Sequence, residues 1–260
     1  MQKRNDLRRE STRLVPRVFL LCSLFFFSIP AWSMAETEVV ATTSLTAAIA
    51  KAAGAKEVKV LTPPGQKHPP EYDLKPSDLL KIEGAAVVIY GGYEKMVSKL
   101  LETTKNKGIQ AIQISTETSP ENLIAQARKI SKVLKSEKEE ETWEKKFLQE
   151  LAGMEKRMSP YAGKRAVVHP FAQPFAKWAR LSIVQVIRPG ELTPRVVAEA
   201  VKKTPDVVVD VLHFPVARVI AENAKCKYAQ VINFPGINET SSLEDIFKYN
   251  STELIKAFQQ

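Results

Sequence analysis

The chain has 260 residues, of which 44% are hydrophobic, so it can form one large domain or two smaller ones around a substantial core. Its formal net charge is +9, but residues 1–35 carry +4 of that charge, which leaves a modest surplus of +5 on the remainder. The basic residues of the remainder are scattered and form no stripe, so we do not expect binding to nucleic acid.

The first 35 residues are typical of an export signal. A basic segment ends at Arg17, the apolar run of residues 18–29 follows, and Ser33 and Ala35 place small residues before a cleavage site. The run is too short to span a bilayer comfortably, and an uncleaved membrane anchor is the alternative reading. We therefore expect cleavage near Ala35 and a periplasmic protein.

Residues 36–118 alternate short apolar strands with helices. The apolar patterns predict strands at 38–42, 57–61, 86–90 and 109–114, and helices at 44–53, 76–84 and 94–104. This alternation indicates a parallel sheet that is covered on both faces, which we expect to form an N-terminal lobe. Its second strand leads into a loop, residues 62–71, in which four prolines surround His68.

Residues 119–160 are predicted to form one long helix that links two lobes. Ser119 can cap its start, Pro120 suits the first helical position, and apolar residues then recur at helical spacing. The spacing shifts between Leu134 and Trp143, so a kink or break is expected there.

Residues 161–260 repeat the strand and helix alternation and are expected to form a C-terminal lobe. Strands are predicted at 165–169, 183–187, 206–211 and 228–232, with helices between them and a last helix that ends at 258. The expected fold class is therefore α/β, with two lobes, each a parallel sheet flanked by helices, joined by one long helix.

The three histidines of the chain occupy equivalent places in this pattern. His68, His169 and His213 each stand at or just beyond the carboxyl end of a predicted strand, and so do Asp210 and Asn233. Open parallel sheets bind their ligands beyond these strand ends. Imidazole nitrogens with one or two oxygens suit zinc, and with more oxygens they also suit manganese or iron. A packed or surface role is the alternative for any single histidine.

Seven segments carry a resemblance to a known family over essentially all of the mature chain. They are residues 38–53 (EVVATTSLTAAIAKAA), His68 with 72–78 (YDLKPSD), 168–178 (VHPFAQPFAKW), 188–194 (RPGELTP), 208–215 (VVDVLHFP), 233–236 (NFPG) and 248–250 (KYN). In order and spacing they resemble the zinc/manganese family of ABC-transporter solute-binding proteins, the TroA/ZnuA-like helical-backbone metal receptors.

The resemblance implies two lobes joined by a long helix, with a divalent transition metal held between them. Zinc is the expected metal and manganese the second choice. The resemblance also implies delivery to a membrane permease that is driven by a cytoplasmic ATPase. Because such a receptor performs no chemistry on its ligand, the protein is not expected to be an enzyme, and a monomer is expected.

The ligand set departs from the family pattern, and only His68 and His169 carry over. His68 stands two residues further from the following tyrosine than the family ligand does. The Asp-Pro-His-x-Trp motif that supplies a second ligand is replaced by residues 118–121 (TSPE), and the usual aspartate of the fourth ligand is Asn233.

The predicted metal ligands are therefore His68, His169, His213 and Asp210, the last two on position alone, with Glu71, Glu191 and Asn233 in reserve. Two alternatives stay open. The same fold can bind a chelated metal or a small organic ligand. A secreted metal-dependent hydrolase would instead use Glu71 or Glu191 as its general base.

Overall fold

The computed structural model describes residues 37–63, 66 and 71–260. The predicted export signal and its cleavage near Ala35 lie outside these residues, and so does His68. Within the described part of the chain, none of the helices combines the length and the apolar character needed to cross a membrane.

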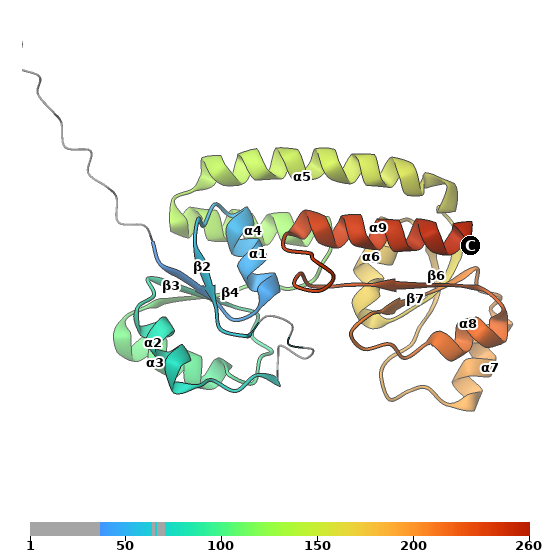
Figure 1. The fold of residues 1–260 in the computed structure, drawn as a ribbon, viewed down its shortest axis with the longest axis horizontal. Helices are drawn as coiled ribbons and strands as arrows, with labels where there is room; N and C mark the ends of the chain where they lie inside the picture. The colour runs from blue at the N-terminus through green and yellow to red at the C-terminus, as the bar shows by residue number, and fades with distance from the viewer. Residues whose placement is uncertain (1–36, 64–65, 67–70) are drawn as a thin grey trace, which may run out of the picture. The chain divides into compact units, whose positions relative to one another are not determined.

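The first sheet is fully parallel, as predicted, and its strands run in the order β2-β1-β3-β4. Side chains alternate along β1 and β3, so Val39 and Ile89 face one hydrophobic cluster while Val40 and Val88 face another. Helix α1 covers the first face, and α2 and α3 cover the second (Figure 1). The elements are β1 (Val39–Ala41), α1 (Ser44–Ala52), β2 (Val58–Val60), α2 (Pro76–Glu83), β3 (Val87–Tyr90), α3 (Val97–Lys107) and β4 (Gln110–Gln113).

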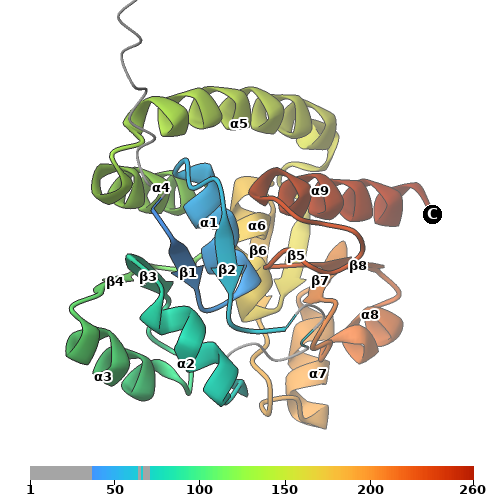
Figure 2. The ribbon, with the colours of Figure 1, turned by 60° about the vertical axis from the view of Figure 1, so that its left-hand side comes forward.

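The second sheet repeats this arrangement with the order β6-β5-β7-β8 and is also parallel. Helices α6 and α9 cover one face, and α7 and α8 cover the other (Figure 2). The elements are β5 (Arg165–Val168), α6 (Gln173–Trp178), β6 (Ser182–Val186), α7 (Pro194–Lys202), β7 (Val207–Val211), α8 (Arg218–Ala224), β8 (Lys227–Val231) and α9 (Leu243–Gln259). We call β1–β4 with α1–α3 the first lobe, and β5–β8 with α6–α8 the second lobe.

The segment predicted as one long helix, residues 119–160, consists of two helices. Helix α4 (Pro120–Leu134) ends at Lys135, whose φ of 56° is left-handed, and α5 (Glu137–Met158) begins two residues later. The amide of Lys135 donates to the carbonyl of Ser131 and closes α4. The break therefore falls in the interval where the apolar spacing shifts, and α5 alone, about 33 Å long at ~1.5 Å per residue, runs along both lobes (Figure 1).

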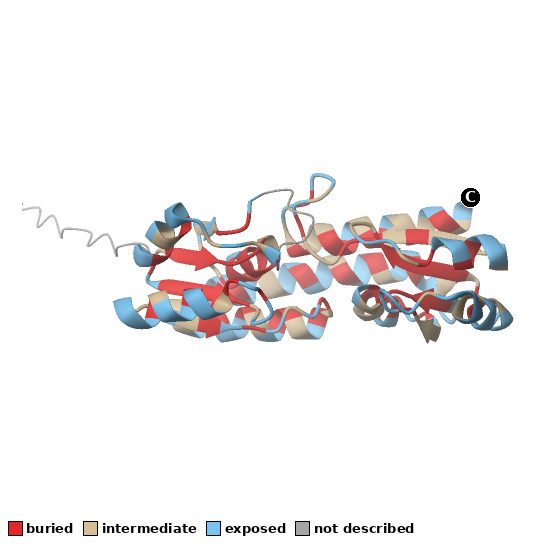
Figure 3. Ribbon diagram, turned by 90° about the horizontal axis from the view of Figure 1, so that it is seen from below, coloured by how far each residue is buried: buried red, intermediate tan, exposed pale blue. Residues whose placement is uncertain are grey.

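Helix α9 joins the hydrophobic clusters of both lobes. Leu243, Ile246 and Phe247 near its start belong to the same buried cluster as β1, β3, α1 and α5. Leu254 and Ala257 near its end belong to the cluster of the second lobe. Residues at the two ends of a helix assigned to the C-terminal lobe by sequence thus contribute to both cores. Figure 3 shows buried positions in both halves of the molecule.

Candidate ligand-binding pocket

A pocket of about 930 Å³ lies where the carboxyl ends of strands from both sheets meet. The first lobe and the start of α4 contribute Thr43, Ser44, Leu45, Tyr93, Thr116, Glu117, Thr118, Ser119 and Glu121. The second lobe and the segment after it contribute Pro170, Phe171, Gln173, Pro174, Lys177, Trp178, His213, Phe214, Asn233 and Phe234. The lining follows the ends of β1, β3, β4, β5, β7 and β8, which is the place that the sequence predicted for a ligand.

Two helices begin at the wall formed by the first lobe. Thr43 caps α1 by accepting the amide of Thr46 at 3.3 Å, and Ser119 caps α4 by accepting the amide of Asn122 at 3.4 Å. Both caps line the pocket, so the positive ends of two helix dipoles point towards its rim.

The Tyr93 loop is held by the buried carboxylate of Glu94. This carboxylate accepts the hydroxyl of Thr42 at 2.6 Å and the amides of Gly91 and Gly92 at 2.8 and 2.7 Å. Because Glu94 serves the loop in this way, α3 begins at Val97 and not at residue 94 as predicted. Tyr93 stands at the pocket with half of its surface exposed.

Asp210 plays the corresponding part in the second lobe. It is fully buried, and its Oδ2 accepts the amides of Val216 and Ala217 at 2.9 and 2.7 Å and the hydroxyl of Tyr228 at 3.1 Å, while Oδ1 accepts the amide of Val211 at 2.9 Å. A carboxylate with these four donors anchors the turn of residues 212–217 and does not line the pocket. Asp210 is therefore not among the residues that we propose as metal ligands.

His169 is fully buried beneath the pocket wall. Its Nδ1 accepts the amide of Phe171 at 3.1 Å, so the neutral ring carries its proton on Nε2, which has no hydrogen-bond partner in the described part of the chain. Burial lowers the pKa of His169, and the negative charge of Asp210 opposes this only in part. A ligating histidine usually donates its second N–H to an acceptor, which is the reverse of the bond to Phe171. That His169 is a metal ligand therefore remains a prediction. The geometry favours a structural role, in which the ring accepts the amide of Phe171.

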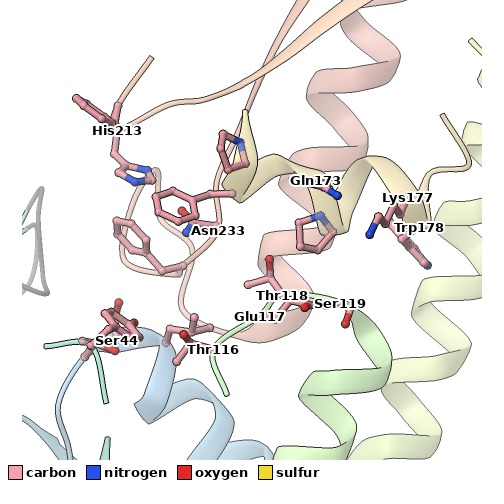
Figure 4. A pocket seen from close by; sticks show the side chains of 18 of the residues that line it. Ser44, Thr116, Glu117, Thr118, Ser119, Gln173, Lys177, Trp178, His213 and Asn233 are labelled. Carbon is pink, nitrogen blue, oxygen red and sulfur yellow. The ribbon is translucent and has the colours of Figure 1, made fainter. Parts of the chain in front are cut away.

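His213 and Asn233 both reach the pocket (Figure 4). The His213 ring meets the edge of Phe234 at a centroid distance of 4.8 Å. The side-chain oxygen of Asn233 is buried without a hydrogen-bond partner among the described residues, so its capacity to accept a hydrogen bond or to hold a cation is unused there.

The reserve acids lie elsewhere. Glu191 is an exposed loop residue 3.6 Å from Arg188, and Glu71 is exposed as well; neither lines the pocket. Across residues 37–63, 66 and 71–260, no group of three or more His, Cys, Asp or Glu side chains is placed to hold a metal ion.

The sequence missed several residues that line the pocket, among them Tyr93, Glu117, Gln173 and Lys177. Tyr93 and Glu117 follow the ends of β3 and β4, so the strand-end rule that selected the histidines also applied to them. Lys177 comes from the body of α6, and no local signal distinguishes it from the other exposed lysines.

Comparisons with known proteins identify the family of this chain and solved structures of the same fold. The model of the ZnuA family, described as zinc-uptake complex component A, periplasmic, matches residues 39–215. The chain belongs to this family. Its members are periplasmic metal-binding proteins of ABC importers. Among the curated proteins, none matches the chain.

Solved structures share the fold at low sequence identity. A periplasmic metal-binding protein from Candidatus Liberibacter asiaticus aligns with a TM-score of 0.67 and 15% identity, over 85% of this chain and 99% of that one. Its Mn-bound form gives 0.66 and 14%, over 85% and 98%. The solute-binding protein FpvC from Pseudomonas aeruginosa in complex with Ni²⁺ gives 0.70 and 16%, over 86% and 97%. The α/β fold with two parallel sheets is thereby confirmed.

Proposed function

We propose that this chain is the periplasmic solute-binding component of an ABC importer and carries a divalent transition metal in the pocket between its lobes. Zinc is the first choice, from the family, and manganese the second, because structural neighbours are described with Mn, Cd and Ni. The observation that carries the proposal is the pocket itself, which six strand ends build and which His213 and Asn233 line.

Three kinds of group would serve the metal. His213 supplies an imidazole nitrogen, Asn233 an amide oxygen without a partner among the described residues, and Glu117 and Glu121 supply negative charge on the facing wall. His68 stays a predicted ligand in the loop that leaves β2, outside the described residues.

Delivery to a permease and its ATPase requires release of the metal. Helix α5 is tied to α9 by the bond from Trp143 Nε1 to Glu244 at 2.8 Å, and to α6 by the bond from Trp178 Nε1 to Glu155 at 2.7 Å. A helix fastened near both ends limits rotation of one lobe against the other, so we propose release through small lobe or loop shifts by a monomeric receptor.

The hydrolase alternative has little support, because Glu71 and Glu191, its candidate bases, do not line the pocket. The size of the pocket favours the alternative of a chelated metal.

The His213→Ala variant tests the proposal. We expect it to lower zinc affinity by at least about tenfold, since a lost ligand costs more than ~1.4 kcal/mol. Isothermal titration of protein purified without a histidine tag, after metal removal, measures the change. Stoichiometric binding at unchanged affinity would remove His213 from the site, and a wild-type protein that binds neither zinc nor manganese would refute the proposed function.

A further inference from the structure

The pocket is far larger than a metal ion requires. A divalent cation with six waters occupies roughly 200 Å³, counting about 30 Å³ for each water. The pocket measures about 930 Å³, which lies at the upper end of the range of roughly 300–1,000 Å³ seen for organic ligands. Most of the space is therefore left for something other than the ion.

Five aromatic side chains line the pocket, beside eleven polar or charged residues. Phe171 and Phe214 expose 53% and 41% of their surface, and Tyr93 exposes 51%. Trp178 and Phe234 complete the aromatic surface. Exposed aromatic side chains gathered at one cavity favour a ligand with flat apolar faces, whereas a bare ion gains nothing from them.

The histidine and the lysine of the pocket stand on different sides of it, and other polar residues, Glu117 among them, lie between them. Figure 4 shows His213 and Asn233 on one side and Lys177 with Trp178 on the other, with Ser119 between them. Lys177 forms no ion pair with any described residue, so its ammonium group is available to a carboxylate. A ligand that carries both a metal and an anionic group would fit this arrangement, with its metal at His213 and Asn233 and its anionic group at Lys177.

We propose that the cargo enters this pocket as a complex of a divalent metal with a small aromatic carboxylate chelator. The metal lies at His213 and Asn233, the flat body packs against Phe171 and Trp178, and a carboxylate pairs with Lys177. The inference rests on the proposed function and names the form in which the metal is carried.

Three 1:1 zinc complexes provide the probes: zinc with pyridine-2,6-dicarboxylate, which is aromatic and carries two carboxylates, zinc with citrate, and zinc with histidine. Zinc chloride and each chelator alone complete the set. Each mixture is passed with the metal-free protein through a short gel-filtration column, and zinc and chelator are measured in the protein fraction. We expect zinc and pyridine-2,6-dicarboxylate to elute with the protein in equal amounts, with the complex bound at least about tenfold more tightly than either component alone.

The outcomes separate the two proposals. If zinc elutes with the protein without any chelator, and all three chelators merely compete for it, the chelate inference is overturned while the metal receptor stands. If a chelator binds equally well without zinc, the chelate inference is overturned as well. If no mixture leaves zinc on the protein, the metal function itself fails.

Two variants localise the chelator. Lys177→Ala is expected to lower affinity for the zinc–dicarboxylate complex by about tenfold and to leave affinity for zinc chloride unchanged, since a hydrogen-bonded charge is lost. Lys132→Ala, an exposed lysine on α4 that does not line the pocket, is the matched control and should change neither. Equal effects of the two lysine changes would overturn the assignment of Lys177.

Phe171→Ala tests the aromatic wall. We expect about a fivefold loss for the complex and none for zinc chloride, because aromatic contacts contribute about 0.5–1.5 kcal/mol. Leu148→Ala, which removes a similarly exposed apolar side chain from α5, is the control. A Phe171→Ala protein that binds the complex as well as the wild type would exclude the aromatic wall from the site.

Discussion

Two buried carboxylates, Glu94 and Asp210, fix the loops that carry pocket residues. Each stands near the carboxyl end of the third strand of its own sheet, β3 or β7, and each accepts at least two backbone amides. In the first lobe the loop presents Tyr93, and in the second lobe it presents His213. The acids thus position the pocket without touching its ligand.

The Asp210→Asn substitution is expected to destabilise the protein by about 2–4 kcal/mol. The new amide group faces the amides of Val216 and Ala217, and a buried donor left without an acceptor costs about 1–3 kcal/mol. Urea unfolding measures the loss, and zinc titration should show weaker binding because His213 is no longer held.

Asp206→Asn provides the control for Asp210. Asp206 precedes the opposite end of β7, accepts the amide of Arg165 at 2.7 Å and lies near Lys164 at the surface. We expect a cost below about 1 kcal/mol and normal zinc affinity. Equal losses in the two variants would contradict a special role for Asp210.

His169 makes stability depend on pH. Burial holds the pKa of the folded histidine below its unfolded value of about 6.5, so the unfolded chain takes up a proton that the folded protein refuses. The free energy of unfolding should therefore fall as pH drops below about 6.5, by at most ~1.4 kcal/mol per pH unit, and level off below the folded pKa.

The His169→Gln variant isolates this contribution, since glutamine does not titrate but still offers an acceptor to the Phe171 amide. Urea unfolding of both proteins between about pH 7.5 and 5.5 should show a stability difference that shrinks or reverses on acidification. Parallel curves would mean that His169 does not contribute.

Single residues show where sequence reasoning succeeds and where it stops. The positions of His169, His213 and Asn233 beyond strand ends were predictable, because they depend only on the strand pattern. The role of Asp210 was not predictable from sequence, because it depends on where the loop after β7 places the amides of Val216 and Ala217. The orientation of the His169 ring was not predictable either, because it depends on the hydrogen bond from the amide of Phe171.

At the scale of elements, the turn between α4 and α5 lies in the interval where a kink or break was expected, but its form was not predictable. The shift of the apolar spacing indicates where the helix is interrupted, but no proline or glycine marks the junction, so the sequence does not distinguish a kink from a turn. What decides the break is Ser136, whose hydroxyl donates to the carbonyl of Ala53, together with the left-handed Lys135. The ion pair between Arg128 of α4 and Glu144 of α5, at 2.6 Å, holds the hairpin that results.

The Lys135→Gly substitution is expected to stabilise the protein by about 1 kcal/mol. Lysine pays a steric cost at φ of 56°, which glycine avoids. Lys132→Gly, inside α4, should instead destabilise by about 1 kcal/mol. Thermal unfolding of the two variants measures the difference, and a destabilising Lys135→Gly would indicate a continuous helix.

At the scale of the molecule, the two lobes share one core along α5 and α9. Phe147 of α5 stacks on Trp143 at 4.8 Å and meets the edge of Phe247 of α9 at 5.6 Å, and all three join the cluster of the first sheet. The parallel sheets were predictable from strand alternation. The packing partners of α9 were not predictable, because an amphipathic pattern shows that one face of a helix is buried but not which elements bury it.

We therefore expect the metal-free protein to unfold in a single cooperative transition. Scanning calorimetry should give equal calorimetric and van't Hoff enthalpies, because neither lobe can lose its structure without exposing the core shared through α9. Two separated transitions would show that the lobes unfold independently.

Trp178 borders the pocket and is also bonded to Glu155 of α5. A ligand in the pocket would therefore lie beside an indole that is itself bonded to the helix that runs along both lobes. Replacing Trp143 with phenylalanine would leave this indole as the sole tryptophan fluorophore of the described chain, and the receptor would then report its own loading by a change of emission without an attached dye.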